Sequence, residues 1–377
     1  MTTSKRLRIG VLFGGRSGEH EVSLASAASV IRALDPEKYE AVPIGISKDG
    51  RWLVGTGAVK LLADVLKSGE RVSLPPDPTS ASLVPLSQGS GHTSITVDVM
   101  FPVLHGTFGE DGTVQGLLEL AGLPYVGAGV LASAVGMDKD VQKRLFAEAG
   151  LPIVPFLAVR RSEWEKNRAK VLLQIKRKFK FPLFVKPATL GSSVGMTRVK
   201  AAHELSAAMD FAAEFALKII VERGVNGREI EVSVLGNDEI RASIPGEIVP
   251  HREYYDYQAK YLEGGTQLVI PAVLTKKQAA TFQEYAVRAF QAIDGTGMAR
   301  CDFFLERSNG KIFVNELNTI PGFTSISMYP KLWEASGLPY PKLIDRLIEL
   351  ALELHREKSR TKYSIELPAG SGGALEA

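Results

Sequence analysis

The sequence predicts an N-terminal α/β domain with a parallel sheet, followed by a chain that mixes helices with antiparallel hairpins. The apolar run Ile9–Phe13 leads through a glycine-rich turn and a helical stretch to a second run, Tyr39–Ile46, which is the order of a βαβ unit. Later apolar runs flank the polar turn Ser308–Gly310, which indicates a β-hairpin. Another hairpin is indicated where a Gly- and Ser-rich loop separates Leu183–Pro187 from Met196–Val199.

Composition limits the possible classes of function. The 377 residues are 45% hydrophobic and 23% charged, as in a soluble globular protein with two or three domains. Forty-five basic against 42 acidic residues leave a formal net charge of +3, which argues against a nucleic-acid or membrane surface. Cys301 is the only cysteine, so we expect a buried thiol and a reducing, cytoplasmic compartment. No apolar stretch approaches the roughly 20 residues that span a bilayer.

The glycine-rich turn after the first strand predicts a ligand site. Its spacing, Gly14-Gly15-x-x-Gly18, differs from the Gly-x-Gly-x-x-Gly of dinucleotide folds, and the second strand does not end in an acidic residue. We therefore expect an anion or small-molecule site at the start of the following helix, beside Glu19 and Ser23. Glu19 is equally compatible with an ordinary first-turn acid that the helix dipole favours.

The next strand also ends at polar residues. After a Ser-, Gly- and Pro-rich excursion over residues 55–96, an apolar strand at 97–104 ends in His105 and leads to a helix, Thr113–Ala121. Open α/β sheets bind ligands at such strand ends. His105 is compatible either with a functional role or with a capped or core histidine. A Pro/Gly-rich link places the first domain boundary near residue 128.

The central part offers a candidate phosphate loop. A helix is predicted over Asp138–Ala149, and a long helix over Ser162–Lys178 begins with a possible capping box. No Walker motif occurs, but residues 188–195 are rich in glycine and serine, whose N–H groups and hydroxyls can enclose an oxyanion. Lys186 precedes this loop and can add a positive charge. A surface hairpin without function explains the same pattern.

The last predicted hairpin gathers charged side chains on one face. A turn centred on Asn309 pairs Asp302 with Glu316 and Arg300 with Asn318. Two facing carboxylates repel unless a positive charge lies between them, and oxygen ligands suit Mg²⁺ or Mn²⁺. Spacing alone leaves two alternatives: a metal site, or a polar face that Arg300 neutralises.

Two further helices, Thr275–Ile293 with a capping box and the amphipathic Leu338–Glu357, are expected to pack on the C-terminal sheet. Residues 253–261 contain four tyrosines without helical periodicity, as in an aromatic lid or a packed strand. The Gly-rich tail from about residue 360 is expected to be disordered.

Five blocks, in order along the chain, together resemble ATP-grasp enzymes and most closely the D-alanine–D-alanine ligase family. They are Gly14–Ser23, His105–Gly112, Lys186–Met196, Tyr255–Tyr261 with Arg300-x-Asp302, and Asn315–Ser327. The resemblance implies a pre-ATP-grasp α/β domain over residues 1–127 and a two-domain ATP-grasp fold. Its central α+β domain covers residues 128–222, and its C-terminal α+β domain covers residues 223–377.

The resemblance also implies roles for individual residues. ATP is held by the phosphate and nucleotide contacts Lys139, Lys186, Ser193, Glu222, Arg223, Glu229 and Lys260. Two Mg²⁺ or Mn²⁺ ions are held by Asp302, Glu316 and Asn318. The catalytic set is Glu19, Ser192, Tyr261, Arg300 and Ser327, and substrate contacts are Ser23, His105, Gly322 and Met328. The family commonly has lysine where this chain has Arg223, which puts the side-chain contact to adenine in doubt.

The function that the resemblance implies is ATP-dependent joining of two D-alanines through a D-alanyl phosphate, for peptidoglycan precursors. It further implies a cytoplasmic homodimer that binds neither nucleic acid nor membrane. Three alternatives stay open: a D-alanine–D-lactate ligase, another ATP-grasp carboxylate–amine ligase, and a nucleotide-binding protein without catalysis. Tyr261 favours the dipeptide, because family members that use D-lactate differ at that position.

Overall fold

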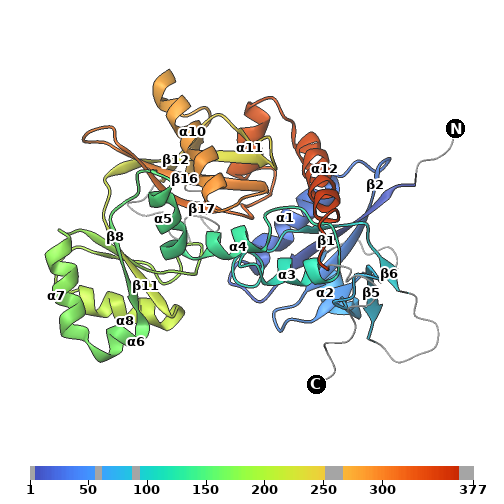
Figure 1. Cartoon of the computed structure of the whole chain (residues 1–377), viewed down its shortest axis with the longest axis horizontal. Helices are drawn as coiled ribbons and strands as arrows, with labels where there is room; N and C mark the ends of the chain where they lie inside the picture. Colours follow the sequence, from blue (N-terminus) through green and yellow to red (C-terminus); the bar gives the residue numbers. More distant parts are fainter. Residues whose placement is uncertain (1–4, 56–61, 87–93, 251–265, 365–377) are drawn as a thin grey trace, which may run out of the picture.

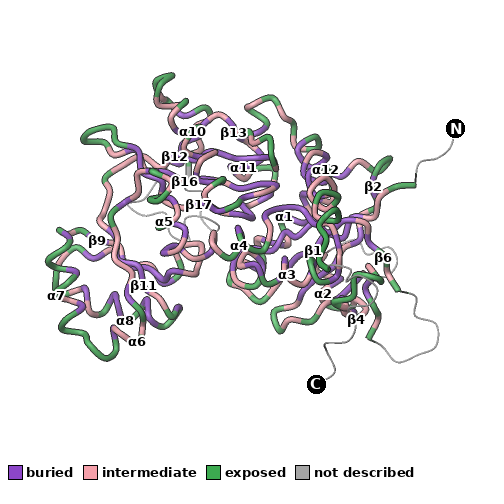
Figure 2. Tube along the Cα trace, viewed as in Figure 1, coloured by how far each residue is buried: buried purple, intermediate pink, exposed green. Residues whose placement is uncertain are grey.

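Three sheets, each formed by one continuous part of the chain, organise the protein (Figure 1). The computed structural model describes residues 5–55, 62–86, 94–250 and 266–364. Figure 2 shows buried residues along the strands of all three sheets and exposed ones on the outer turns of the helices. No helix among the described residues is long and apolar enough to cross a membrane.

The N-terminal sheet has the predicted parallel centre. Strand β1 (Leu7–Gly14) lies between β2 (Tyr39–Ile46) and β7 (Val99–Pro102), parallel to both. Beyond β2 this sheet continues as an antiparallel series that starts at β3 and runs through the excursion at 55–96. Its strands are β3 (Trp52–Val54), β4 (Glu70–Ser73), β5 (Ser82–Pro85) and β6 (Ile95–Thr96), and the helices are α1 (His20–Ala33), α2 (Leu62–Ser68) and α3 (Thr113–Leu120).

The central part is a four-stranded antiparallel sheet, ordered β10-β9-β11-β8, with helices around it. Its elements are α4 (Val130–Met137), α5 (Lys139–Glu148), β8 (Phe156–Arg160), α6 (Arg161–Lys166), α7 (Arg168–Lys178), β9 (Leu183–Pro187), β10 (Thr197–Val199), α8 (Leu205–Phe215) and β11 (Lys218–Arg223). The predicted helix from Ser162 to Lys178 is wrong as one element. It is broken at Asn167, and Arg160, not Ser162, precedes its first turn.

The C-terminal sheet is antiparallel, ordered β15-β14-β12-β16-β17, with β13 also beside β12. Its elements are β12 (Gly227–Gly236), β13 (Arg241–Ala242), β14 (Gly246–Pro250), β15 (Thr266–Val269), α10 (Lys276–Ala292), β16 (Gly297–Glu306), β17 (Ile312–Asn318), α11 (Met328–Ala335) and α12 (Tyr340–Lys358). The capping box of Thr275 and Gln278 is confirmed at the start of α10.

Helix α12 departs from the expected packing. Its apolar residues, such as Leu343 and Leu347, join the core formed by Ile9 and Phe101 of the N-terminal sheet. Lys38 also forms an ion pair of 2.8 Å with Asp345. In Figure 1, α12 lies beside α1 and β1. The helix therefore joins the end of the chain to its beginning instead of covering the C-terminal sheet alone.

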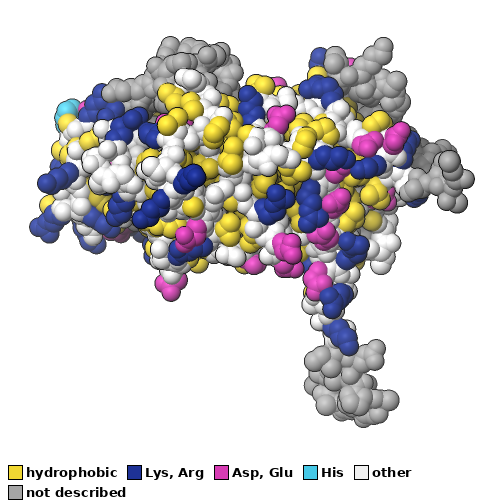
Figure 3. Space-filling view, turned by 90° about the horizontal axis from the view of Figure 1, so that it is seen from above, with side chains coloured by type: hydrophobic (Ala, Val, Ile, Leu, Met, Phe, Trp, Pro, Cys, Tyr) yellow, Lys and Arg dark blue, Asp and Glu magenta, His cyan; other side chains and the backbone are white. Residues whose placement is uncertain are grey.

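The surface carries charges of both signs. Figure 3 shows Lys and Arg side chains concentrated toward the end of the molecule that contains the central sheet, whereas acidic and basic side chains are mixed elsewhere on that face. Helix α7 contributes to the basic end with five Lys or Arg residues and no acid. The expected tail lies mostly at residues 365–377, outside the described part of the chain.

Candidate active site

The predicted pairing across the last hairpin is confirmed. Asp302 of β16 lies opposite Glu316 of β17, and Arg300 lies opposite Asn318. The turn itself differs from the prediction, because nearer the turn the pairs follow a register shifted by one residue, such as Phe303 with Val314.

A β-bulge corrects that shift before the polar face begins. The register changes between Asp302 and Phe303 on β16, and Asn315 is the extra residue on β17. Without the extra residue, Glu316 would lie opposite Cys301 and point to the other face of the sheet. The bulge is therefore what brings Asp302 and Glu316 together.

Arg300 neutralises part of this face. Its Nε and Nη2 atoms donate to the two carboxylate oxygens of Asp302, each at 2.7 Å, and Nε lies 3.0 Å from Oε2 of Glu231. Asn318 also donates to Asp302, at 2.9 Å. Glu231 lies on β12 directly opposite Asp302, so the acids Glu231, Asp302 and Glu316 form a row across three strands.

Two carboxylates and an amide on one face supply oxygen donors only, which is the donor set that hard divalent cations prefer. The residues therefore fit Mg²⁺ or Mn²⁺. Among the residues that the structure describes, no group of three or more His, Cys, Asp or Glu side chains is arranged for a metal. The predicted set has two such residues, Asp302 and Glu316, with Asn318 as the third donor.

Lysines from the central part reach the hairpin. Lys139 begins α5, where its ammonium lies 3.3 Å from Oε2 of Glu316 and donates to the carbonyl of Leu190 at 2.8 Å. The ammonium of Lys186 on β9 lies 2.7 Å from Oε2 of Glu222. Burial alone lowers the pKa of Lys186, but the charges of Glu222 and Glu316 outweigh it and raise the pKa. Lys186 therefore stays cationic beside the serine-rich loop.

Strands β11 and β12 carry two of the proposed nucleotide contacts, Arg223 and Glu229. Arg223 forms an ion pair of 2.6 Å with Glu306 and stacks on Phe313, with 5.3 Å to the ring centroid. Its guanidinium is thus already engaged. Glu229 precedes Glu231 by two residues on β12, so both side chains point to the face that carries Asp302.

The glycine turn and the serine-rich loop meet. Ser192 donates a short hydrogen bond to Oε1 of Glu19, and the two residues are 173 positions apart. Gly14 and Gly15 adopt positive φ angles of 91° and 99°, which lets the chain turn sharply before α1. Gly106 has a positive φ of 75°, and a Cβ atom there would lie 2.9 Å from Oε2 of Glu19, so a side chain at this position would displace the carboxylate. Ser193 also belongs to the loop, with φ at 59°.

Two predicted substrate contacts, Ser23 and His105, are buried side chains of the N-terminal part. Ser23 is fully buried. Its hydroxyl accepts from the backbone N–H of Gly14 at 2.8 Å and donates to the carbonyl of Val103, directly after β7. His105 is buried too, with its ring nitrogens 3.1 Å from the carbonyl of Ile320 and 3.2 Å from Ser26 Oγ. Burial lowers the pKa of His105, but the neighbouring Glu110 outweighs it and raises the pKa. Ser23 thus supports the glycine turn, whereas His105 contacts α1 and the chain at Ile320, and the contact of either side chain with substrate stays a prediction.

The remaining predicted residues lie near the start of α11 or outside the described chain. Ser327 precedes α11, where its Oγ accepts from the N–H of Thr324 at 3.1 Å. A Cβ atom at Gly322 would lie 3.2 Å from that oxygen, and Met328 is buried against Gly246. Lys260 and Tyr261 lie outside the described residues.

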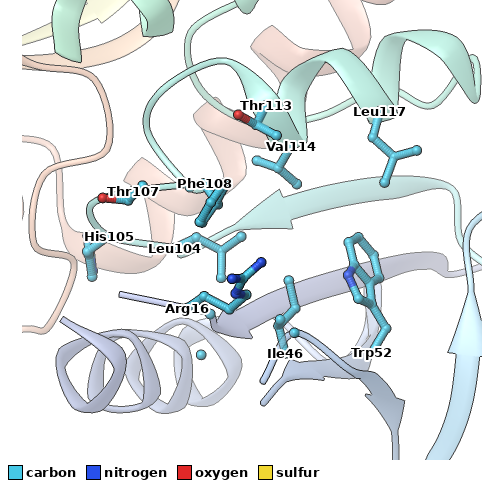
Figure 4. A pocket seen from close by; sticks show the side chains of 14 residues that line it. Arg16, Ile46, Trp52, Leu104, His105, Thr107, Phe108, Thr113, Val114 and Leu117 are labelled. Carbon is cyan, nitrogen blue, oxygen red and sulfur yellow. The ribbon is translucent and has the colours of Figure 1, made fainter. Parts of the chain in front are cut away.

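A separate hollow of about 210 Å³ lies beside the glycine turn (Figure 4). Figure 4 shows Arg16 pointing toward Phe108, with Leu104, Val114 and Leu117 forming an apolar wall. The guanidinium of Arg16 lies 5.1 Å from the centroid of the Phe108 ring. None of the proposed phosphate or metal residues lines this hollow, but His105, a proposed substrate contact, forms part of its wall.

Sequence reasoning missed two charged residues, Glu231 and Lys143. Glu231 alternates with Glu229 along β12, so the strand period could have identified it. Lys143 follows Lys139 by one helical turn, which places both on one face of α5. That spacing was the available signal, although most helix lysines are exposed.

Comparisons with known proteins agree over nearly the whole chain. The family models "D-ala D-ala ligase N-terminus" and "D-ala D-ala ligase C-terminus" match residues 8–128 and 145–349. A D-alanine–D-alanine ligase of Heliobacterium modesticaldum is 52% identical, with 93% of this chain and 96% of the relative covered. The corresponding protein of Bacillus cytotoxicus is 50% identical, with 96% and 99% covered.

Solved structures give the same result. The D-alanine–D-alanine ligase of Coxiella burnetii matches with a TM-score of 0.83 and 39% identity, over 95% of this chain and 97% of that one. The VanG D-Ala:D-Ser ligase of Enterococcus faecalis also matches with a TM-score of 0.83, at 37% identity over 92% and 100% of the two chains. With an ATP-grasp architecture and relatives half identical over almost their full length, the chain belongs to the D-alanine–D-alanine ligase family.

Proposed function

We propose that the protein joins two D-alanines to D-alanyl-D-alanine while converting ATP to ADP and phosphate, and so supplies a peptidoglycan precursor. The observation that best supports this proposal is the contact of Glu19, which we assign to the amino-acid ammonium, with Ser192 of the loop that we assign to the phosphates. The family relationship supplies the identity of the substrate.

The reaction has two steps. The carboxylate of the first D-alanine attacks the γ-phosphorus of ATP, which forms an acyl phosphate and releases ADP. The amine of the second D-alanine then attacks the acyl carbon, and phosphate leaves with one oxygen of the original carboxylate. Positioning and charge stabilisation dominate such phosphoryl transfer, because the protein forms no covalent bond.

The chain's own residues divide this work. Glu19 holds the ammonium of the first D-alanine, and Ser192 orients the Glu19 carboxylate by its hydrogen bond. Lys139 and Lys186 bind phosphate oxygens, to which they bring fixed positive charges. Arg300 stabilises the reacting carboxylate and then the oxyanion of the tetrahedral intermediate, once substrate competes with Asp302 for its guanidinium.

Asp302, Glu316 and Asn318 are the residues that would hold two Mg²⁺ or Mn²⁺ ions. Such ions supply neutralisation of the charge on the β- and γ-phosphates. Ser193 closes over the phosphates, while Glu222, Arg223, Glu229 and Lys260 belong to the proposed nucleotide pocket. Ser327 and Met328 meet the second substrate, and Tyr261 completes a chain with Glu19 and Ser192.

The test is a screen for ADP release with single amino acids of both hands, D-serine and D-lactate, followed by product mass. We expect ADP release with D-alanine and a product with the mass of the dipeptide. ATP binding without turnover on any of these compounds would contradict the proposal and favour a nucleotide-binding protein.

The likeness to a D-Ala:D-Ser ligase favours one alternative, a ligase whose second substrate is not D-alanine. A mixture of D-alanine with D-serine or D-lactate distinguishes it, because the three products differ in mass. We further propose that the protein acts in the cytoplasm as a homodimer, and light scattering on the purified protein tests the dimer.

A further inference from the structure

Lys143 is an enclosed lysine beside the proposed ATP site. It lies on α5 one turn after Lys139, and its side chain has no exposed surface. Its ammonium lies 2.8 Å from Oε1 of Glu222, whereas the ammonium of Lys186 lies 2.7 Å from Oε2 of the same carboxylate. Each oxygen of Glu222 therefore faces a different lysine, one from α5 and one from β9.

The contact of Lys143 with Glu222 is electrostatic. At 2.8 Å the two atoms form an ion pair, but neither has a hydrogen bond of good geometry within the described part of the chain. Burial alone raises the pKa of Glu222, yet the charges of Lys143 and Lys186 outweigh it and lower that pKa to about 2. Burial also lowers the pKa of Lys143. A carboxylate this deeply enclosed needs positive partners to remain charged.

The charges of the cluster leave a surplus. Lys143 and Lys186 contribute two positive charges and Glu222 one negative charge, so the three groups together carry a net charge of +1. Glu316, which also attracts both lysines, is matched by its own partner Lys139. If Lys143 were neutral, Lys186 and Glu222 would form a closed pair with no net charge. In a buried site with low effective dielectric, one unit of charge changes the binding of an anion strongly.

We propose that Lys143 is a positioning residue for nucleotide binding. By balancing the negative charge of Glu222, it leaves the positive charge of Lys186 available to the phosphates of ATP. This inference rests on the proposed function, because it takes ATP to be the ligand of Lys186. Lys143 itself touches no substrate in this account. Helix α5 thereby links two parts of the site, since Lys139 on the same helix face reaches Glu316.

The test compares Lys143→Met, Glu222→Gln and the double variant for binding of ADP and of adenosine, measured by calorimetry without D-alanine. The net charge of the three groups is +1 in the natural protein, 0 in Lys143→Met, +2 in Glu222→Gln and +1 in the double variant. We expect Lys143→Met to weaken ADP at least about tenfold, while adenosine, which has no phosphate, changes less than about twofold. The double variant should bind ADP at least about threefold more tightly than Lys143→Met, because it restores the net charge of +1 although it lacks the Glu222 carboxylate of the proposed nucleotide pocket.

Two results would overturn the inference. Failure of the double variant to bind ADP better than Lys143→Met would mean that Lys143 contacts the nucleotide itself. An equal loss for adenosine and ADP would mean that Lys143 only supports the shape of the pocket.

Lys143→Arg is the second variant if Lys143→Met does not fold, and we expect it to retain the ratio of ADP to adenosine affinity. An at least about tenfold fall in the ratio of ADP to adenosine affinity in Lys143→Arg, which keeps the positive charge, would also contradict the inference. Because no ligation is measured, failure of this test is distinguishable from absence of ligase activity.

Discussion

The polar hairpin and the Glu19–Ser192 contact reach their geometry in different ways. On the hairpin, Arg300, Asp302 and Glu316 stand on paired strands of one sheet, whose backbone hydrogen bonds fix their spacing. Glu19 and Ser192 instead lie in loops that follow strands of two different sheets, β1 and β9, and the contact exists only while those parts of the chain are docked. In the mechanism that we propose, the first arrangement carries the phosphate chemistry, and the second carries the binding of the first amino acid.

The largest effect is expected from Arg300→Ala. Removing a charge-stabilising donor of this kind typically lowers kcat by about 10²–10³. ADP affinity should be retained, because Arg300 faces the reacting carboxylate in our account. Steady-state turnover and ADP calorimetry measure the two quantities.

Arg300→Lys is the matched control for charge, and we expect intermediate turnover because a lysine cannot make the paired contacts to Asp302. Thermal melting checks the fold, since Glu231 loses a buried partner when Arg300 is removed. Near-normal turnover of Arg300→Ala would rule out its role.

A smaller effect is expected from Ser192→Ala, which removes the hydrogen bond to Glu19. A hydrogen bond to a charged group contributes on the order of 1.5 kcal/mol, so KM for the first D-alanine should rise about tenfold. KM for ATP should change much less. Ser193→Ala is the neighbouring control. An unchanged KM for D-alanine in Ser192→Ala would show that the Ser192–Glu19 hydrogen bond does not contribute to substrate binding.

The hollow beside the glycine turn is the alternative place where the amino acid could bind. Leu117→Phe fills part of it without touching the polar site. We expect kcat and both KM values to stay within about twofold. A large rise in KM for D-alanine would show that amino acid binds in the hollow and not at Glu19.

The smallest effect on activity is expected from Thr275→Ala, at the start of α10. Loss of this helix cap should lower the free energy of unfolding by about 1 kcal/mol. Kinetic constants should not change, because the cap lies at an exposed helix end. Denaturant unfolding measures the loss, and a coupled assay measures the constants.

The sequence could predict elements with a strong local period, but not every contact among them. Strand β2 and the hairpin face follow from alternation and turn residues, although the face is correct only because the bulge at Asn315 offsets a turn one position away from the predicted one. Helix α12 shows the limit, since amphipathic spacing reveals an apolar stripe without identifying its partner. Lys143 is similar, because its spacing from Lys139 indicates a shared helix face but not that this face is buried.

The most direct test of this division is Glu19→Gln, measured for both ligands. The account predicts that KM for the first D-alanine rises at least about tenfold, because the substrate ammonium loses a charged partner. ADP affinity should remain within about twofold, because Glu19 stands on the N-terminal domain and the phosphate residues do not depend on its charge. A parallel fall in ADP affinity and D-alanine affinity would contradict the account.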